Sequence, residues 1–222
     1  MKKSVIVLLS AAFLTTVGCR HSLEVKNSNR YCGITAADHR QQGLSIALVP
    51  NSHKQLYFLQ ALAPKLQVAG NYKTFIANDS NSSQTSDIQL LFKIDYDGSA
   101  NPGNFFVCFP GCFIFTHVWL GYGYTVHWET TIQGIDTKTG KQLFREPIGM
   151  DLDFRYARCG TSWANNMLFI FPFPLVNGFV NMTYDDKATP MFLDKSLDTI
   201  TDYTAVKLVE KINTAYSNRA SL

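Results

Sequence analysis

The apolar and polar positions in the first half of the chain predict a strand followed by a helix. Residues 44–49 are nearly all apolar and end at Pro50, which predicts a strand buried on both faces, since proline cannot continue a central strand. Leucines then recur at three- and four-residue spacing over residues 56–66, which places one apolar stripe on a helix. Pro64 predicts a kink or a split in this helix, and Gly70 predicts its end.

Two further strands follow, with a polar loop between them. Residues 72–77 predict a short strand, and the polar run 78–86 predicts a loop without an apolar anchor. Residues 87–96 alternate apolar and polar side chains with a period of two, which is typical of a half-buried strand. The dipeptide Asp97-Gly98 predicts that this strand ends there.

A long hairpin and a final helix complete the pattern. Residues 122–136 and 141–156 flank a turn that contains a glycine, and they predict two paired strands. Residues 196–216 place apolar side chains on one side of a helix. The order of strand, helix, strands, hairpin and helix predicts an α+β fold in a single domain, with a mixed, mostly antiparallel sheet and helices packed on it.

Two aromatic segments, residues 105–120 and 163–180, are nearly uncharged, and prolines interrupt both, so neither predicts a transmembrane helix. One interpretation makes them core strands or a buried helix. The other makes them an exposed apolar surface for a membrane or a partner protein. The aromatic residues that such a surface would use are Phe105, Phe106, Phe113, Phe115, Trp119, Trp163, Phe169, Phe171 and Phe173. Tyr122, Tyr124 and Trp128 would extend it as an interfacial belt.

The first nineteen residues carry the pattern of an export signal. Two lysines precede an apolar run at residues 5–17, which has the length of a secretory signal and is too short to cross a bilayer. Gly18 then supplies a small residue before Cys19. The stretch Thr16-Val17-Gly18-Cys19 resembles the lipobox of bacterial lipoproteins, in which the cysteine is the residue that receives the lipid.

The resemblance to bacterial lipoproteins implies a lipid anchor at Cys19, with acyl chains such as palmitate. It divides the chain into a signal peptide (1–18), a lipidated tether (19–42) and a periplasmic α+β domain (43–222). Arg20 stands where an aspartate commonly retains such proteins at the inner membrane, which favours the periplasmic face of the outer membrane, with exposure at the cell surface as an alternative. The order of the elements, with an Asp-x-x-Thr-Gly-Lys hairpin turn, is also similar in outline to periplasmic lipoproteins with folds like the N-terminal domain of TolB.

Apart from the lipidation residue, four cysteines remain, and an even number in an exported protein predicts disulfides. A Pro-Gly turn between Cys108 and Cys112 would set the two opposite each other on a hairpin, within disulfide reach. Cys32 and Cys159 would then form the second bridge. The alternative is four buried free thiols. No metal site is predicted, because the CxxxC spacing is loose and lacks a second ligand pair.

The charge of the chain argues against nucleic acid as a class of partner. Removing the two signal lysines from the 20 Lys and Arg residues leaves 18 against 17 Asp and Glu, a formal net charge of +1. Phosphate binding depends on clustered basic residues, and the sequence has no basic run. Asp194, Asp198 and Asp202 lie four residues apart on the last helix and predict a solvated acidic face, with a cation site as the alternative.

Common catalytic motifs do not occur in the sequence, and no cofactor is predicted. His117 and His127 have no pattern of carboxylates beside them and are interpreted as hydrogen-bonded structural residues. We therefore expect a non-enzymatic membrane-anchored lipoprotein with a role in envelope assembly or in binding a protein partner. The alternatives are a lipid- or membrane-binding module that uses residues 105–120 and 163–180, and a periplasmic hydrolase of an unrecognised family.

Overall fold

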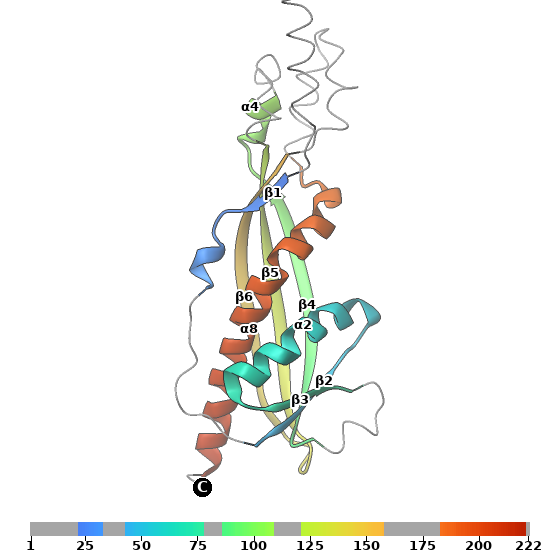
Figure 1. The fold of residues 1–222 in the computed structure, drawn as a ribbon, viewed down its shortest axis with the longest axis vertical. Coiled ribbons are helices and arrows are strands. Elements are labelled where there is room, and N and C mark those ends of the chain that lie inside the picture. The colour runs from blue at the N-terminus through green and yellow to red at the C-terminus, as the bar shows by residue number, and fades with distance from the viewer. Residues whose placement is uncertain (1–21, 33–42, 78–85, 109–120, 158–182, 221–222) are drawn as a thin grey trace, which may run out of the picture. The chain divides into compact units, whose positions relative to one another are not determined.

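The computed structural model describes residues 22–32, 43–77, 86–108, 121–157 and 183–220. In these ranges one six-stranded mixed sheet has the strand order β1-β6-β5-β4-β2-β3, with helices beside it (Figure 1). The strands are β1 (Ser22–Val25), β2 (Ser45–Val49), β3 (Lys73–Ile76), β4 (Ile88–Ala100), β5 (Tyr122–Asp136) and β6 (Gln142–Ala157). The helices are α2 (His53–Gly70), α4 (Asn104–Cys108) and α8 (Thr189–Ala220), with short 3-10 turns η1 (Ser28–Arg30) and η3 (Asp186–Ala188).

Parallel and antiparallel pairs coexist in the sheet, as the predicted fold class requires. β2 lies between β3 and β4 and is parallel to both. β5 runs antiparallel to β4, because the Thr137 amide donates to the Asp87 carbonyl while the Asn101 amide donates to the Gly123 carbonyl. β5 and β6 form the predicted hairpin. The α+β prediction is confirmed.

Contacts between Cα atoms group the chain into two compact parts, which we describe separately. Among the described residues, the smaller part comprises 22–24, 99–108, 121–124, 154–157 and 183–188. The larger part comprises the other described residues.

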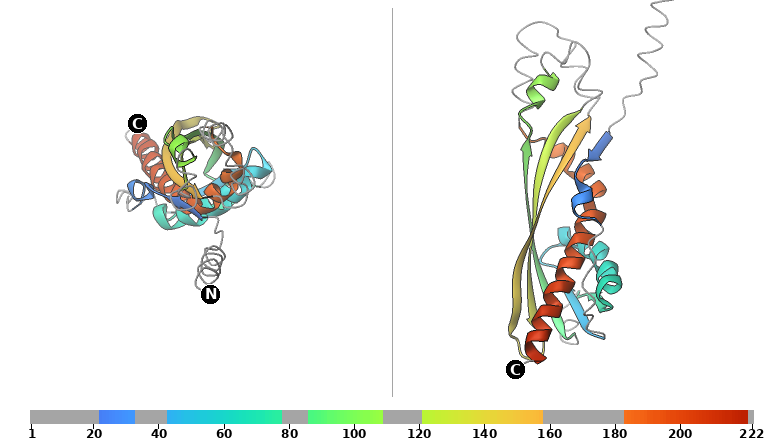
Figure 2. Two further views of the ribbon diagram at one scale, coloured as in Figure 1. Left: turned by 90° about the horizontal axis from the view of Figure 1, so that it is seen from above. Right: turned by 90° about the vertical axis from the view of Figure 1, so that its left-hand side faces the viewer.

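The core of the larger part lies between the sheet and two helices. Ile46, Ala47 and Leu48 of β2 are fully buried, as the apolar run predicted. Helices α2 and α8 pack against each other, and Figure 2 shows both on one face of the strands. The ring of Phe58 on α2 lies 6.0 Å from that of Trp128 on β5, which joins helix and sheet.

An ion-pair cluster links α2 to α8 at the surface. Lys65 Nζ lies 3.1 Å from Asp198 Oδ1 and 2.9 Å from Asp202 Oδ1. The acidic face of α8 is exposed, as predicted, and the positive group that two of its carboxylates bind is this lysine. The helix itself begins at Thr189, seven residues before the predicted start at Ser196.

Helix α2 differs from its prediction at two points. Pro64 does not split it, and the helix runs unbroken from His53 to Gly70. The left-handed residue that ends it is Asn71, with φ of 55°, rather than the glycine. Gly70 serves packing instead, because a Cβ there would lie 2.1 Å from the ring of Tyr72. Burial raises the pKa of Tyr72 to about 12, and its hydroxyl contacts Asn213 Oδ1 at 3.2 Å.

In the smaller part, aromatic rings gather where the strands carry alternating buried side chains. The rings of Tyr124, Phe154 and Tyr184 lie 5.4 to 6.5 Å apart.

Strand β4 continues to Ala100, so the predicted strand end at Asp97-Gly98 is wrong.

Candidate functional site

The first described residues of the chain dock along the edge of β6, and we call residues 22–31 the N-terminal strap. β1 is the outermost strand on this side of the sheet and pairs with β6. The Lys26 amide then donates to the Asp153 carbonyl at 2.8 Å. Beyond this point the strap is no longer a strand, and an unpaired strand edge is open to association with other chains. Two side chains of the strap bind the next groups of the edge.

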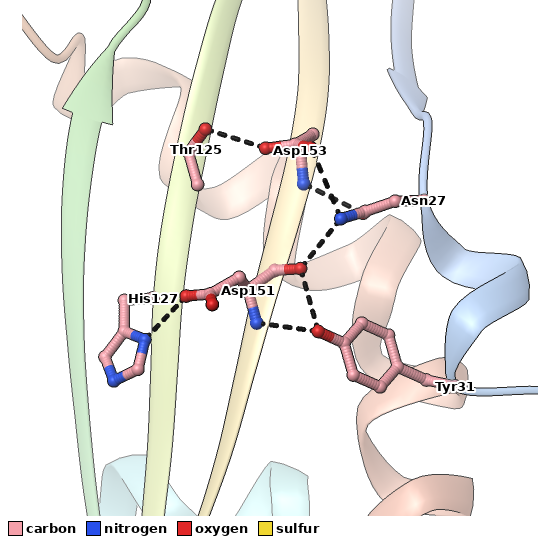
Figure 3. A network of polar contacts seen from close by, with 6 residues as sticks. All are labelled: Asn27, Tyr31, Thr125, His127, Asp151 and Asp153. Carbon is pink, nitrogen blue, oxygen red and sulfur yellow. Dashed lines mark hydrogen bonds and ion pairs between the residues drawn. The ribbon is translucent and has the colours of Figure 1, made fainter.

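Asn27 supplies from its side chain the partners that a strand would supply from its backbone (Figure 3). Its Nδ2 donates to the Asp151 carbonyl at 2.8 Å and to Asp153 Oδ2 at 3.3 Å. Its Oδ1 accepts from the Asp153 amide at 2.9 Å. A carboxamide offers the same kinds of donor and acceptor as a peptide group, so Asn27 extends the pairing of β1 with β6.

Tyr31 covers the following position of the edge. Its hydroxyl accepts from the Asp151 amide at 2.9 Å and donates to the Asp151 carbonyl at 3.1 Å. Its ring packs edge-on against Tyr203 of α8, with 5.1 Å between the ring centroids. The strap is therefore held by both β6 and α8.

The carboxylates of the same two aspartates face β5. His127 Nδ1 lies 2.7 Å from Asp151 Oδ1, and the Thr125 hydroxyl donates to Asp153 Oδ1 at 2.7 Å. The hydrogen bond to Asp151 raises the pKa of His127 above its ordinary value, against a smaller opposing effect of burial. We call these six residues, including Asn27 and Tyr31, the edge network.

The hydrogen bonds of the edge network join the strap, β5 and β6 to one another. A carboxylate at Nδ1 of a histidine leaves Nε2 to accept a proton, which is the arrangement of a general base. Here the hydroxyls of Thr125 and Tyr31 are bonded to Asp153 and Asp151, so they hold the strands and the strap together. His127 is hydrogen-bonded on a strand, as predicted.

The edge network was not predicted, and the reason is an extra residue in β6. The turn pairs Asp136 with Lys141, since the Asp136 amide donates to the Lys141 carbonyl. From there, nine positions lead back along β5 to His127, whereas ten lead along β6 to Asp151. A count from the turn would place His127 opposite Met150, whose side chain is on the other face. Such a shift is the effect of a β-bulge, which this sequence pattern does not reveal.

Few of the predicted site residues lie in the described ranges. Cys32 is an exposed free cysteine, and Cys108 is the last residue of α4 rather than part of a hairpin strand. Their predicted partners lie outside the described residues, so both disulfides stay predictions. The other predicted residues outside the described ranges are Cys19, Cys112, Cys159, Phe113, Phe115, Trp119, Trp163, Phe169, Phe171 and Phe173, together with His117.

The aromatic residues that are described separate into buried and exposed ones. Tyr122, Tyr124 and Trp128 are buried, so the predicted interfacial belt is wrong for these three. They occupy alternate positions of β5 whose side chains all point into the core. Phe105 and Phe106 lie on α4, and Phe106 is 68% exposed.

The described ranges contain neither a cluster of metal ligands nor a membrane-spanning helix. Within them, no three His, Cys, Asp or Glu side chains converge as ligands for a metal ion. No helix in those ranges combines the length and the hydropathy needed to span a bilayer.

Comparison with known proteins places the chain in no family. No family model matches it, and no curated protein sequence does. Among solved structures, PelC of Paraburkholderia phytofirmans, crystallised as a dodecamer, is 13% identical with a TM-score of 0.28, over 73% of this chain and 99% of PelC. A neuraminyllactose-binding hemagglutinin homolog of Helicobacter pylori is 9% identical with a TM-score of 0.43, over 86% and 96%. TolB of Acinetobacter baumannii is 12% identical with a TM-score of 0.30, over 75% of this chain and 33% of TolB. Likenesses at this distance define neither a family nor a function.

Proposed function

We propose that the chain is a lipid-anchored, non-enzymatic protein of the bacterial envelope, whose folded domain binds a protein partner. The observation that carries this proposal is the continuity between the predicted anchor and the sheet. β1 begins at Ser22, three residues after Cys19, and the edge network fastens the strap to β6. A lipid at Cys19 would therefore connect to the domain through a paired strand rather than through a loose tether.

The edge network supports a non-enzymatic role. A hydrolase could use His127 with Asp151 as a general base, but the hydrogen bonds around Asp151 support a structural role for this pair. The backbone of Asp151 holds Asn27 and Tyr31, while its carboxylate holds His127. Both groups of this aspartate thus contribute to fixing the strap and the hairpin.

The outer face of α2 is the surface we propose for a protein partner. Tyr57 is 58% exposed and Val68 is 80% exposed, and Ala61 and Pro64 lie between them at helical spacing on the same face. Lys65 is the single charged residue in the range 55–70, and it pairs with α8. An uncharged, partly apolar helix face of this kind is typical of a protein interface.

Cell fractionation of Cys19→Ser tests the anchoring. The natural chain should sediment with membranes, and the variant should lose most of that association, because the lipid attachment atom is gone. A matched control is Cys32→Ser, which removes an exposed thiol elsewhere in the chain and should leave the chain in the membrane fraction. Equal sedimentation of the natural chain and Cys19→Ser would contradict the proposal.

Photo-crosslinking in intact cells tests the partner surface. A photoreactive amino acid at position 68 should yield a discrete protein adduct, identified by mass spectrometry. The same amino acid at Thr139, in the β5–β6 turn, serves as the control and should not give that adduct. Identical adducts at both positions would indicate random collision.

A further inference from the structure

One region of the smaller part has no charged side chains. The described residues 99–108 and 121–124 contain no Asp, Glu, Lys or Arg. We call this region the α4 rim. Within it Phe106 is 68% exposed, and its ring packs edge-on against Phe105 with 5.5 Å between centroids. The rim therefore presents an aromatic ring to its surroundings with little charge to desolvate.

Helix α4 is fixed to the start of β5. The Asn101 amide donates to the Gly123 carbonyl at 2.9 Å. The Asn104 side chain donates to the same carbonyl at 2.9 Å and accepts from the Gly123 amide at 2.7 Å. Figures 1 and 2 show α4 beyond the ends of β4 and β5. Phe106 thus has a defined position past the strand ends.

The direction of β1 brings the predicted anchor to the same end of the sheet. Lys26 lies beside Asp153 and Tyr31 beside Asp151, so the strap runs antiparallel to β6 and Ser22 lies toward Ala157. This end of β6 adjoins the start of β5, because the rings of Tyr124 and Phe154 lie 5.4 Å apart. The start of β1, the end of β6 and the start of β5 therefore belong to one edge of the smaller part.

Cys19 cannot be far from this edge. Ser22 is three positions after Cys19, and a fully extended chain spans about 3.5 Å per residue, so the separation is at most about 10 Å. Acyl chains on Cys19 would hold this edge at the bilayer surface.

We propose that the α4 rim is a membrane-contact surface, and that Phe106 enters the boundary between lipid headgroups and acyl chains. The proposal rests on the lipidation of Cys19 proposed above, and it adds a second contact with the bilayer. Aromatic rings favour this boundary, and the described residues of the α4 rim carry no ionised side chain that would have to leave water.

Site-specific photo-crosslinking to lipid tests the proposal. The full lipidated chain, with p-benzoylphenylalanine in place of Phe106, is reconstituted in vesicles of phosphatidylethanolamine and phosphatidylglycerol. Val68 is the matched control position, because it is also an exposed apolar residue. We expect about tenfold more phospholipid adduct from position 106 than from position 68, as an interfacial residue requires. Equal or absent lipid adducts would overturn the proposal, as would a protein adduct from position 106 in cells with no lipid adduct.

The intact mass of the same samples separates this inference from the anchoring proposal. An acylated Cys19 without lipid adduct at position 106 would overturn the rim contact and leave the anchor in place. A chain with unmodified Cys19 would overturn the anchor. In a Cys19→Ser chain added to vesicles, a phospholipid adduct at position 106 would support the rim contact independently of lipidation at Cys19.

Discussion

Asn27 and Asn104 each use a side-chain carboxamide where a sheet would use a peptide group. Asn27 binds the carbonyl of Asp151 and the amide of Asp153, and Asn104 binds both backbone groups of Gly123. In each case the chain leaves the sheet at once, and the asparagine satisfies strand groups that would otherwise need water or another strand. Single side chains therefore add to the backbone hydrogen bonds that attach the strap and α4 to the strands.

Replacing Asn27 by aspartate should weaken the attachment of the strap. Asn27→Asp removes the two Nδ2 donor contacts and places a second carboxylate beside Asp153. We expect the free energy of unfolding to fall by about 1–2 kcal/mol, measured by urea denaturation. In hydrogen exchange, the amides of Asp151 and Asp153 should exchange faster. Gln60→Glu makes the same chemical change at an exposed position of α2 and should alter stability by less than about 0.5 kcal/mol. Equal losses in both variants would contradict the role of Asn27.

The pair of His127 and Asp151 should make stability depend on pH. The pKa of His127 is raised in the folded chain above its ordinary value of 6.5, mainly by the hydrogen bond to Asp151. The folded state therefore binds this proton more tightly than the unfolded state. The stabilisation is fully present below the unfolded pKa, provided that Asp151 is ionised, and is lost as pH rises through the folded pKa.

Urea denaturation of the natural chain and of His127→Asn at pH 5.5 and pH 9 measures this effect. The natural chain should exceed the variant in stability by more at pH 5.5 than at pH 9. A difference that is the same at both pH values would show that the ion pair contributes nothing.

The elements follow local patterns in their middles and tertiary contacts at their ends. The buried run of β2, the leucine stripe of α2 and the long hairpin were predicted because burial imposes a period on the sequence. The residues at which the elements begin and end were not all predicted. β4 passes through Asp97-Gly98, and β1, with four residues, is too short to show a period. The burial of Trp128 depends on contact with Phe58, from a different element, which no local pattern contains.

The end of α2 gives a test at the scale of one element. Gly70→Ala would place a Cβ 2.1 Å from the buried ring of Tyr72, so the ring or the helix end must move. We expect a loss of about 1–3 kcal/mol in the free energy of unfolding. Gly149→Ala on β6 is the matched control, since its nearest neighbour would be a His127 carbon at 3.7 Å, an ordinary contact. An unchanged stability of Gly70→Ala would show that Tyr72 is not held where the structure has it.

For the whole molecule, the sequence predicted the fold class and a membrane location, whereas the structure added the attachment of residues 22–31 to the sheet. Residues 19–42 were predicted as one tether. Residues 22–31 of that range instead include β1 and the side chains that bind β6. The edge network could not be predicted because an extra residue in β6 shifts the register, and short polar segments such as the strap carry no periodic signal.

The central claim is that Cys19 carries the lipid that joins this domain to a membrane. Intact mass spectrometry of the chain purified from its native membranes measures this directly. The account predicts a chain that begins at Cys19 and carries the added mass of a diacylglycerol and an amide-linked acyl group. A chain that retains residues 1–18, or one that begins near residue 19 with an unmodified cysteine, would contradict it.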